Sequence, residues 1–98
     1  MYKPQFYTTI DREKIAKDIS KEGFDPLVIS NGQGFIYSLH QHPETKLLVF
    51  LEGSMDVKVG DKTYLCKRGD KLIIPGNTSH QAIVGSNGCT FFWSEKVV

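Results

Sequence analysis

The sequence predicts an all-β protein, a sandwich or barrel of short strands preceded by a single helix. From residue 27 onward, short runs rich in β-branched and aromatic residues alternate with turn sequences about every eight to twelve residues. Helical periodicity is confined to one segment near the N-terminus. The chain has 98 residues, of which 40% are hydrophobic and 23% charged, as expected for one globular domain.

Residues 1–26 are expected to form an N-terminal extension with a helix over residues 12–22. Asp11 can cap this helix by accepting a backbone hydrogen bond. Ile10 and Ile15 would then occupy the two positions of a hydrophobic staple, and the glycine at position 23 suits the left-handed residue that ends a helix. The apolar stripe of the helix is narrow, so we expect it to pack against the outside of a larger unit.

Residues 27–98 are expected to form the barrel, in one domain with the extension. VGDK at residues 59–62 predicts a hairpin, GSNG at residues 85–88 predicts another, and EG at residues 52–53 predicts a turn. Asp70, which follows a glycine, is expected to be a turn residue. The predicted strands lie at residues 27–30, 34–42, 46–51, 54–59, 62–66, 71–74, 80–84 and 89–94.

The charge pattern contains no strongly basic or acidic region. Net charge is +1, without a basic stripe or an acidic tail, so nothing favours nucleic acid or an anionic membrane as a partner. No stretch approaches the roughly 18 apolar residues of a membrane span. Cys66 and Cys89 form no C-x-x-C pair and are typical of buried thiols in a reduced compartment. We therefore expect a cytoplasmic protein.

The three histidines are the strongest candidates for chemistry. His40 and His42 lie two residues apart, and strand alternation would place both on the face of Ile36 and Ser38. His80 begins a later strand. Three imidazoles can hold zinc, manganese, iron, nickel or copper. Two histidines on an exposed face would merely be polar, and the spacing alone leaves both interpretations open.

Two longer motifs resemble those of the cupin family. GFIYSLHQH at residues 34–42, followed by KLLVFLEG, is similar to the first cupin motif, and GDKLIIPGNTSH at residues 69–80 is similar to the second. The departures in the second motif are Asn77 in place of glycine and Val84 in place of an asparagine. The resemblance covers roughly residues 27–94. It implies a small single-domain cupin, a jelly-roll β-barrel in which the motif histidines converge.

The resemblance also implies a ligand set. Cupins usually hold a divalent metal through two histidines and a glutamate of the first motif and the histidine of the second. Carried over, this implies His40, His42 and His80 as metal ligands, but Lys46 takes the place of the glutamate. At about 5 Å and an effective dielectric of about 20, an ammonium and a divalent ion repel by roughly 6–7 kcal/mol. Structural zinc sites gain about 10–16 kcal/mol, so we expect metal binding to be weakened and not abolished.

Lys46 has three possible roles. It can replace the metal's charge in a metal-free cavity that binds a small organic anion, or it can lie beside a three-histidine metal and hold a substrate carboxylate. It can also pair with Glu44 or Glu52 and have no chemical role. The matching functions are a metal-dependent enzyme, a small-molecule-binding module, and a structural dimer with a vestigial site. No catalytic residue, substrate or reaction follows from the sequence.

Apolar residues on the expected outer face predict a homodimer. An apolar outer face on a small barrel requires a covering sheet, most simply that of a second copy. The outward positions that strand alternation assigns to apolar residues are Tyr37, Leu47, Val49 and Leu51.

Overall fold

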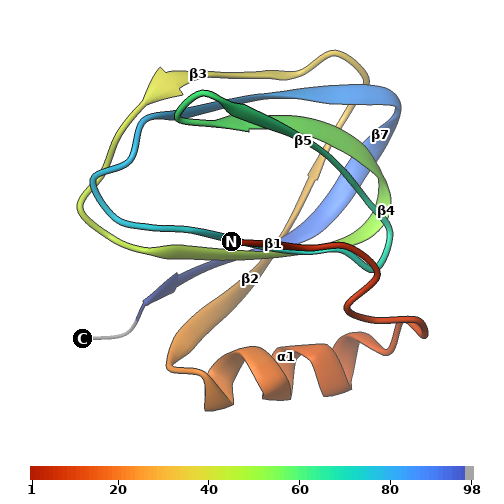
Figure 1. Cartoon of the computed structure of the whole chain (residues 1–98). Helices are drawn as coiled ribbons and strands as arrows, with labels where there is room; N and C mark the ends of the chain where they lie inside the picture. The colour runs from red at the N-terminus through yellow and green to blue at the C-terminus, as the bar shows by residue number, and fades with distance from the viewer. Residues whose placement is uncertain (97–98) are drawn as a thin grey trace.

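The computed structural model describes residues 1–96 as a barrel of two antiparallel sheet layers, with one helix outside it (Figure 1). The prediction of an all-β barrel behind a short N-terminal helix is confirmed. The elements in chain order are β1 (Tyr2–Lys3), α1 (Arg12–Lys21), β2 (Phe24–Asn31), β3 (Ile36–His40), β4 (Lys46–Val59), β5 (Lys62–Lys67), β6 (Lys71–Ile74) and β7 (His80–Lys96).

The two long strands β4 and β7 pass through both layers. The first half of β4 and the second half of β7 pair with each other, and β6, β1 and β2 complete this layer, which we call the helix-side layer. The second half of β4 and the first half of β7 also pair, and β5 and β3 flank them to form the open layer. The inner core lies between the layers and includes Leu48, Phe50, Val57 and Phe91.

Glycines bend the two long strands where one layer becomes the other. The expected turn at residues 52–53 and the expected hairpin at residues 85–88 both lie inside continuous strands, so both predictions were wrong. Gly53 and Gly88 have φ values of 74° and 72°, and a Cβ on Gly53 would lie 1.9 Å from the Gly88 carbonyl oxygen. Glycine is needed there because the strands cross closely at an irregularly paired corner. The VGDK hairpin between β4 and β5 is confirmed.

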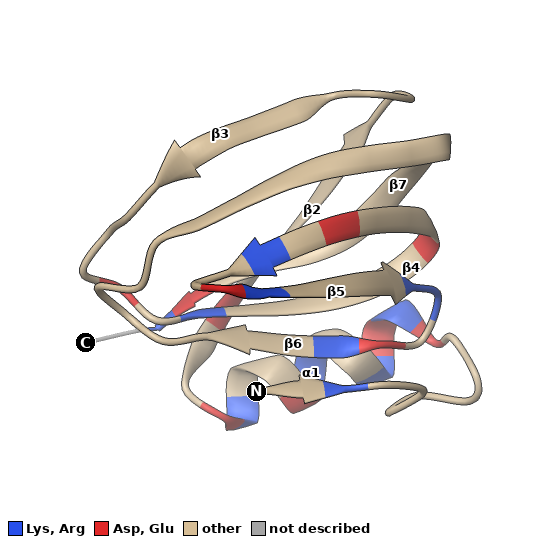
Figure 2. Cartoon of the chain, turned by 45° about the horizontal axis from the view of Figure 1, so that its top comes forward, with Lys and Arg blue, Asp and Glu red and all other residues tan. Residues whose placement is uncertain are grey.

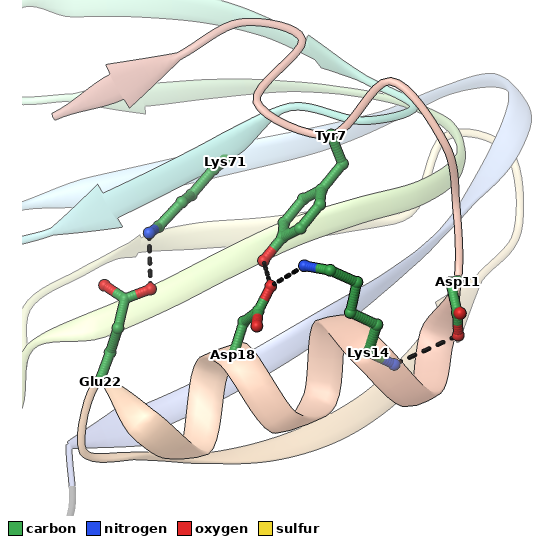
Figure 3. Close-up of polar contacts among 6 residues, drawn as sticks. All are labelled: Tyr7, Asp11, Lys14, Asp18, Glu22 and Lys71. Carbon is green, nitrogen blue, oxygen red and sulfur yellow. Dashed lines mark hydrogen bonds and ion pairs between the residues drawn. The ribbon is translucent and has the colours of Figure 1, made fainter.

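The helix begins and ends close to the predicted residues. The Asp11 carboxylate accepts a hydrogen bond from the Lys14 backbone N–H at 3.2 Å, and Gly23 has a φ of 89°. Within the described residues no helix is both long and apolar enough to cross a membrane. Side chains from outside the helix tie it to the barrel (Figure 3): Tyr7 donates to Asp18 at 2.9 Å and Lys71 donates to Glu22 at 2.7 Å.

The helix covers the apolar residues that were expected to need a partner. Leu47, Val49 and Leu51 have no exposed surface and share a cluster with Ile15 and Ile19 of the helix. Because this chain supplies its own cover, the argument for a homodimer from these three residues was wrong.

A bulge in β3 changes which of its side chains face inward. Tyr37 pairs with Ala82 and His40 pairs with His80, so β3 uses one more residue than β7 over the same length. Tyr37 and His40 therefore both face the interior, and the Tyr37 ring stacks on Trp93. Ile36 is 63% exposed. The predictions that Tyr37 points outward and that His40 shares a face with Ile36 were wrong.

The two cysteines are buried in the inner core, as predicted, and neither forms a disulfide. Burial raises the pKa of the Cys89 thiol to about 11. Both side chains therefore act as small apolar groups in the packing between the layers.

Candidate metal centre

The barrel brings the three histidines together. His40 ends β3, His42 lies in the loop that follows, and His80 begins β7. One ring nitrogen from each lies within 4.8 Å of the others. The ring centroids of His40 and His80 are 4.2 Å apart, and those of His42 and His80 are 4.7 Å apart. The prediction that the three side chains converge is confirmed.

The turn before β7 holds the loop that carries His42. The Asn77 backbone N–H donates to the His42 carbonyl oxygen at 2.7 Å, and Asn77 adopts the left-handed conformation expected where the motif has glycine, with a φ of 60°. A Cβ on Gly76 would lie 2.1 Å from the Pro43 carbonyl oxygen. The Gly76 N–H donates to the Thr45 hydroxyl at 3.2 Å. The second motif therefore positions the loop of the first.

In each of the three histidines, Nδ1 of the imidazole ring forms a hydrogen bond with a backbone carbonyl oxygen. A carbonyl oxygen only accepts hydrogen bonds, so each Nδ1 carries the proton and each neutral ring has its lone pair on Nε2. Anchoring of one ring nitrogen by a carbonyl is typical of metal-binding histidines. The contacts join Nδ1 of His40 to the Ser38 carbonyl, Nδ1 of His42 to the Glu44 carbonyl at 3.1 Å, and Nδ1 of His80 to the Thr78 carbonyl at 3.0 Å.

The opposite nitrogens are left without partners. Among the described residues, no group hydrogen-bonds the buried Nε2 atoms of His42 and His80. An unsatisfied buried polar atom costs about 1–3 kcal/mol. Burial lowers the pKa of His80, and the neighbouring His40, His42 and Lys46 lower it further against the effect of the Thr78 carbonyl. In their neutral form, three imidazoles whose ring nitrogens converge fit a divalent transition ion and leave coordination positions open.

Lys46 is buried beside the histidine cluster, and the carboxylate of a more exposed residue balances its positive charge. The residue is 5% exposed, and its ammonium donates to the carboxylate of Glu95, its cross-strand neighbour on β7. The Lys46 Nζ also lies 5.3 Å from the centre of the Trp93 ring. Of the three roles considered for Lys46, the one with an ion pair named Glu44 or Glu52 as the partner, and the structure has Glu95 in their place. The hydrogen bond from Lys46 and its charge lower the pKa of Glu95, whose side chain is 51% exposed.

The space inside the barrel next to the histidines is small. A cavity lined by His40, His80, Leu48 and Trp93, among others, has a volume of about 10 Å³. That volume is close to what one water molecule requires. The interior therefore has room for an ion or a solvent molecule, and an organic ligand has to bind at the surface around Glu95, which we call the mouth.

The fold and the histidine cluster define a small cupin. The chain resembles an RmlC-like cupin from Shewanella frigidimarina (TM-score 0.70, 18% identity, covering 78% of this chain and 68% of that one). It also resembles KdgF from Halomonas sp. (0.68, 15%, 78% and 72%) and the Mn(II)-containing oxalate decarboxylase of Bacillus subtilis (0.68, 20%, 76% and 21%). Residues 24–95 match the AraC-like ligand binding domain, and the chain belongs to that family.

These similarities concern part of each protein. The chain spans about seven-tenths of the length of the Shewanella cupin and of KdgF, and 21% of the decarboxylase. At under 25% identity, the structural likeness shows the fold alone. No curated protein matches this chain.

Proposed function

We propose that this protein is a metal-binding cupin whose His40, His42 and His80 hold one divalent ion of zinc, manganese, iron, nickel or copper. The observation that carries the proposal is the common anchoring of the three rings. Each Nδ1 is held by a carbonyl, and the buried Nε2 atoms of His42 and His80 have no partner among the described residues. A bound ion would supply the missing partner for both.

Three neutral imidazoles leave coordination positions open for a second ligand. When bound, the ion would supply Lewis-acid chemistry to an oxygen atom of that ligand. The role of this chain is to orient the three rings through Ser38, Glu44 and Thr78 and to keep His80 neutral by burial. The same arrangement serves a binding protein and an enzyme, and no side chain is assigned to catalysis.

Lys46 is the proposed binding residue for the carboxylate of a small organic anion. A buried ammonium requires a counter-charge, and its present counter-charge, Glu95, is half exposed on the last strand. A ligand carboxylate at the mouth would replace that of Glu95 and keep the ammonium neutralised. The Trp93 ring next to the ammonium would flank the ligand.

The Lys46–Glu95 pair also supports metal binding. An isolated ammonium would repel a divalent ion by several kcal/mol at about 5 Å. Because the neighbouring carboxylate carries the opposite charge, part of that repulsion is offset. We therefore expect this site to hold a metal more strongly than the sequence alone indicated.

The second candidate function is a metal-free small-molecule-binding module. The observation that favours it is the family, whose description is that of a ligand-binding domain. In that case the His42 and His80 nitrogens would accept hydrogen bonds from the ligand, and Lys46 would bind its carboxylate. A structural dimer with a vestigial site would bind neither ligand nor metal. A cytoplasmic location, in keeping with the two free thiols, is part of both proposals.

Isothermal titration with zinc and manganese tests the metal proposal. The protein is purified without a histidine tag, and the fluorescence of Trp93, its one tryptophan, provides a second signal near the site. We expect one ion per chain for the wild type and no uptake for His80→Ala. Lys17→Ala, which changes an exposed side chain on the helix, is the control and should bind as the wild type does. Absence of uptake by the wild type would contradict the proposal and favour the metal-free module.

A further inference from the structure

The outer face of the open layer has a regular composition. Pairing across β3, β7, β4 and β5 aligns two outward rows. The first row joins Ile36, Ile83, Asp56 and Leu65. The second row joins Ser38, Gln81, Lys58 and Thr63.

The aliphatic side chains of the first row are uncovered. Ile36 is 63% exposed, Leu65 is 57% exposed and Ile83 is 45% exposed. Ile36 and Ile83 also line a shallow hollow of about 370 Å³ on this face. On the helix-side layer, α1 lies over the outer surface (Figure 1), and Leu47, Val49 and Leu51 beneath it have no exposed surface. Within residues 1–96, no segment does the same for the open layer.

The charges on this face are complementary to each other. Asp56 and Lys58 lie two residues apart on β4, point to the same side and are both exposed. Neither forms an ion pair with another described residue. Figure 2 shows acidic and basic stretches following one another on this part of β4, while β3 and the adjoining part of β7 carry no charge.

We propose that this face binds a second copy of the same chain. In a two-fold interface, each residue pair occurs twice. An axis that runs across the strands between the two rows would place Asp56 of each copy opposite Lys58 of the other. The aliphatic row of each copy would then cover the hollow of the other, in the face-to-face packing of two β-sheets. Asp56 and Lys58 carry opposite charges, so a second copy of this face, turned by the two-fold axis, is complementary to the first.

A charge-swap series tests the interface by sedimentation velocity at micromolar concentrations. We expect a dimer for the wild type. Asp56→Lys and Lys58→Asp each place like charges opposite one another twice, so each should raise the dimer dissociation constant at least tenfold. The double variant D56K/K58D restores both pairs and should dimerise nearly as the wild type does. Asp61→Lys, which makes the same charge change in the exposed β4–β5 turn, should have no effect.

The outcomes separate the proposal from its alternatives. An 11.1 kDa species only, at all concentrations, would overturn the proposal. A dimer that neither single variant weakens would place the interface on another surface. A dimer that both single variants weaken and the double variant fails to restore would overturn the proposed register. None of these results depends on metal binding, because the histidines lie outside this face.

Discussion

Two of the buried polar sites in the barrel differ in how their polar atoms are satisfied. The Asp70 carboxylate, with no exposed surface, accepts hydrogen bonds from the Tyr2 hydroxyl, the backbone N–H groups of Gln5 and Lys67, and the Gln5 side chain. The histidine cluster has equally buried atoms, yet two of its Nε2 nitrogens have no partner among residues 1–96. A satisfied buried group holds the fold together, whereas convergent unsatisfied groups indicate a binding site.

The largest effect should follow from removing the satisfied site. Asp70→Ala leaves the buried donors of Tyr2, Gln5 and Lys67 without an acceptor and releases the N-terminal segment from the barrel. We expect the free energy of unfolding to fall by about 3 kcal/mol or more. Urea denaturation measures the change, and Asp70→Asn, which keeps one acceptor oxygen, should lose less. A loss below about 1 kcal/mol would show that the carboxylate does not anchor the segment.

Replacing a ligand histidine should instead remove the stabilisation that bound metal gives to the folded protein. Zinc at about one hundred times its dissociation constant should stabilise the wild type by about 2.7 kcal/mol, because it binds only the folded state. His80→Ala should lose this gain completely, whatever its stability without metal. Thermal denaturation with and without zinc measures the gain for each variant. An equal gain in both would mean that the ion binds elsewhere.

The stability that the Asp70 site contributes should depend on pH. Burial opposes ionisation of Asp70, but its hydrogen bonds, first that from Tyr2, outweigh burial and hold the pKa of the carboxyl below its ordinary range. Because the pKa is lower in the folded state, its stabilisation is present above the unfolded pKa of about 3.9 and is lost as pH falls through the folded value. Urea midpoints at acidic pH should show a smaller decline for Asp70→Asn than for the wild type. Identical declines would contradict this assignment.

The smallest effects should come from the Lys46–Glu95 pair. Lys46→Gln removes a positive charge near the ion and should raise zinc affinity by about threefold or more. Glu95→Gln removes the compensating negative charge and should lower zinc affinity by a similar factor. Isothermal titration of the two variants measures both changes. Shifts of the same sign would show that the pair acts through the packing of the mouth and not through its charge.

The sequence predicted the parts of this structure that depend on local order. The helix with its Asp11 cap and the VGDK hairpin follow from short motifs, and both are confirmed. The convergence of the three histidines, also confirmed, was implied by the resemblance to the cupin motifs and not by local order.

The failures come from non-local structure. Glycines at residues 85–88 are typical of a hairpin, yet here they let β7 bend around β4, a contact with residues more than thirty positions away. The extra residue in the β3 bulge changes the alternation of side chains along the strand, so Tyr37, which was expected to point outward, faces the interior. Asp70 closes the turn that begins at Lys67, as expected, but the anchoring of the N-terminal segment by its buried carboxylate depends on a contact with Gln5 that the sequence does not indicate. Glu95 was missed because only the register of β4 and β7 brings it to Lys46.

The protonation of the imidazole nitrogens tests the central claim most directly. Long-range ¹H–¹⁵N correlation spectra at neutral pH distinguish the two neutral tautomers of each histidine. We predict that His40, His42 and His80 all carry the proton on Nδ1, and that one equivalent of zinc shifts the Nε2 signals of all three. Protons on Nε2, or zinc-induced shifts in fewer than three rings, would contradict a three-histidine metal centre.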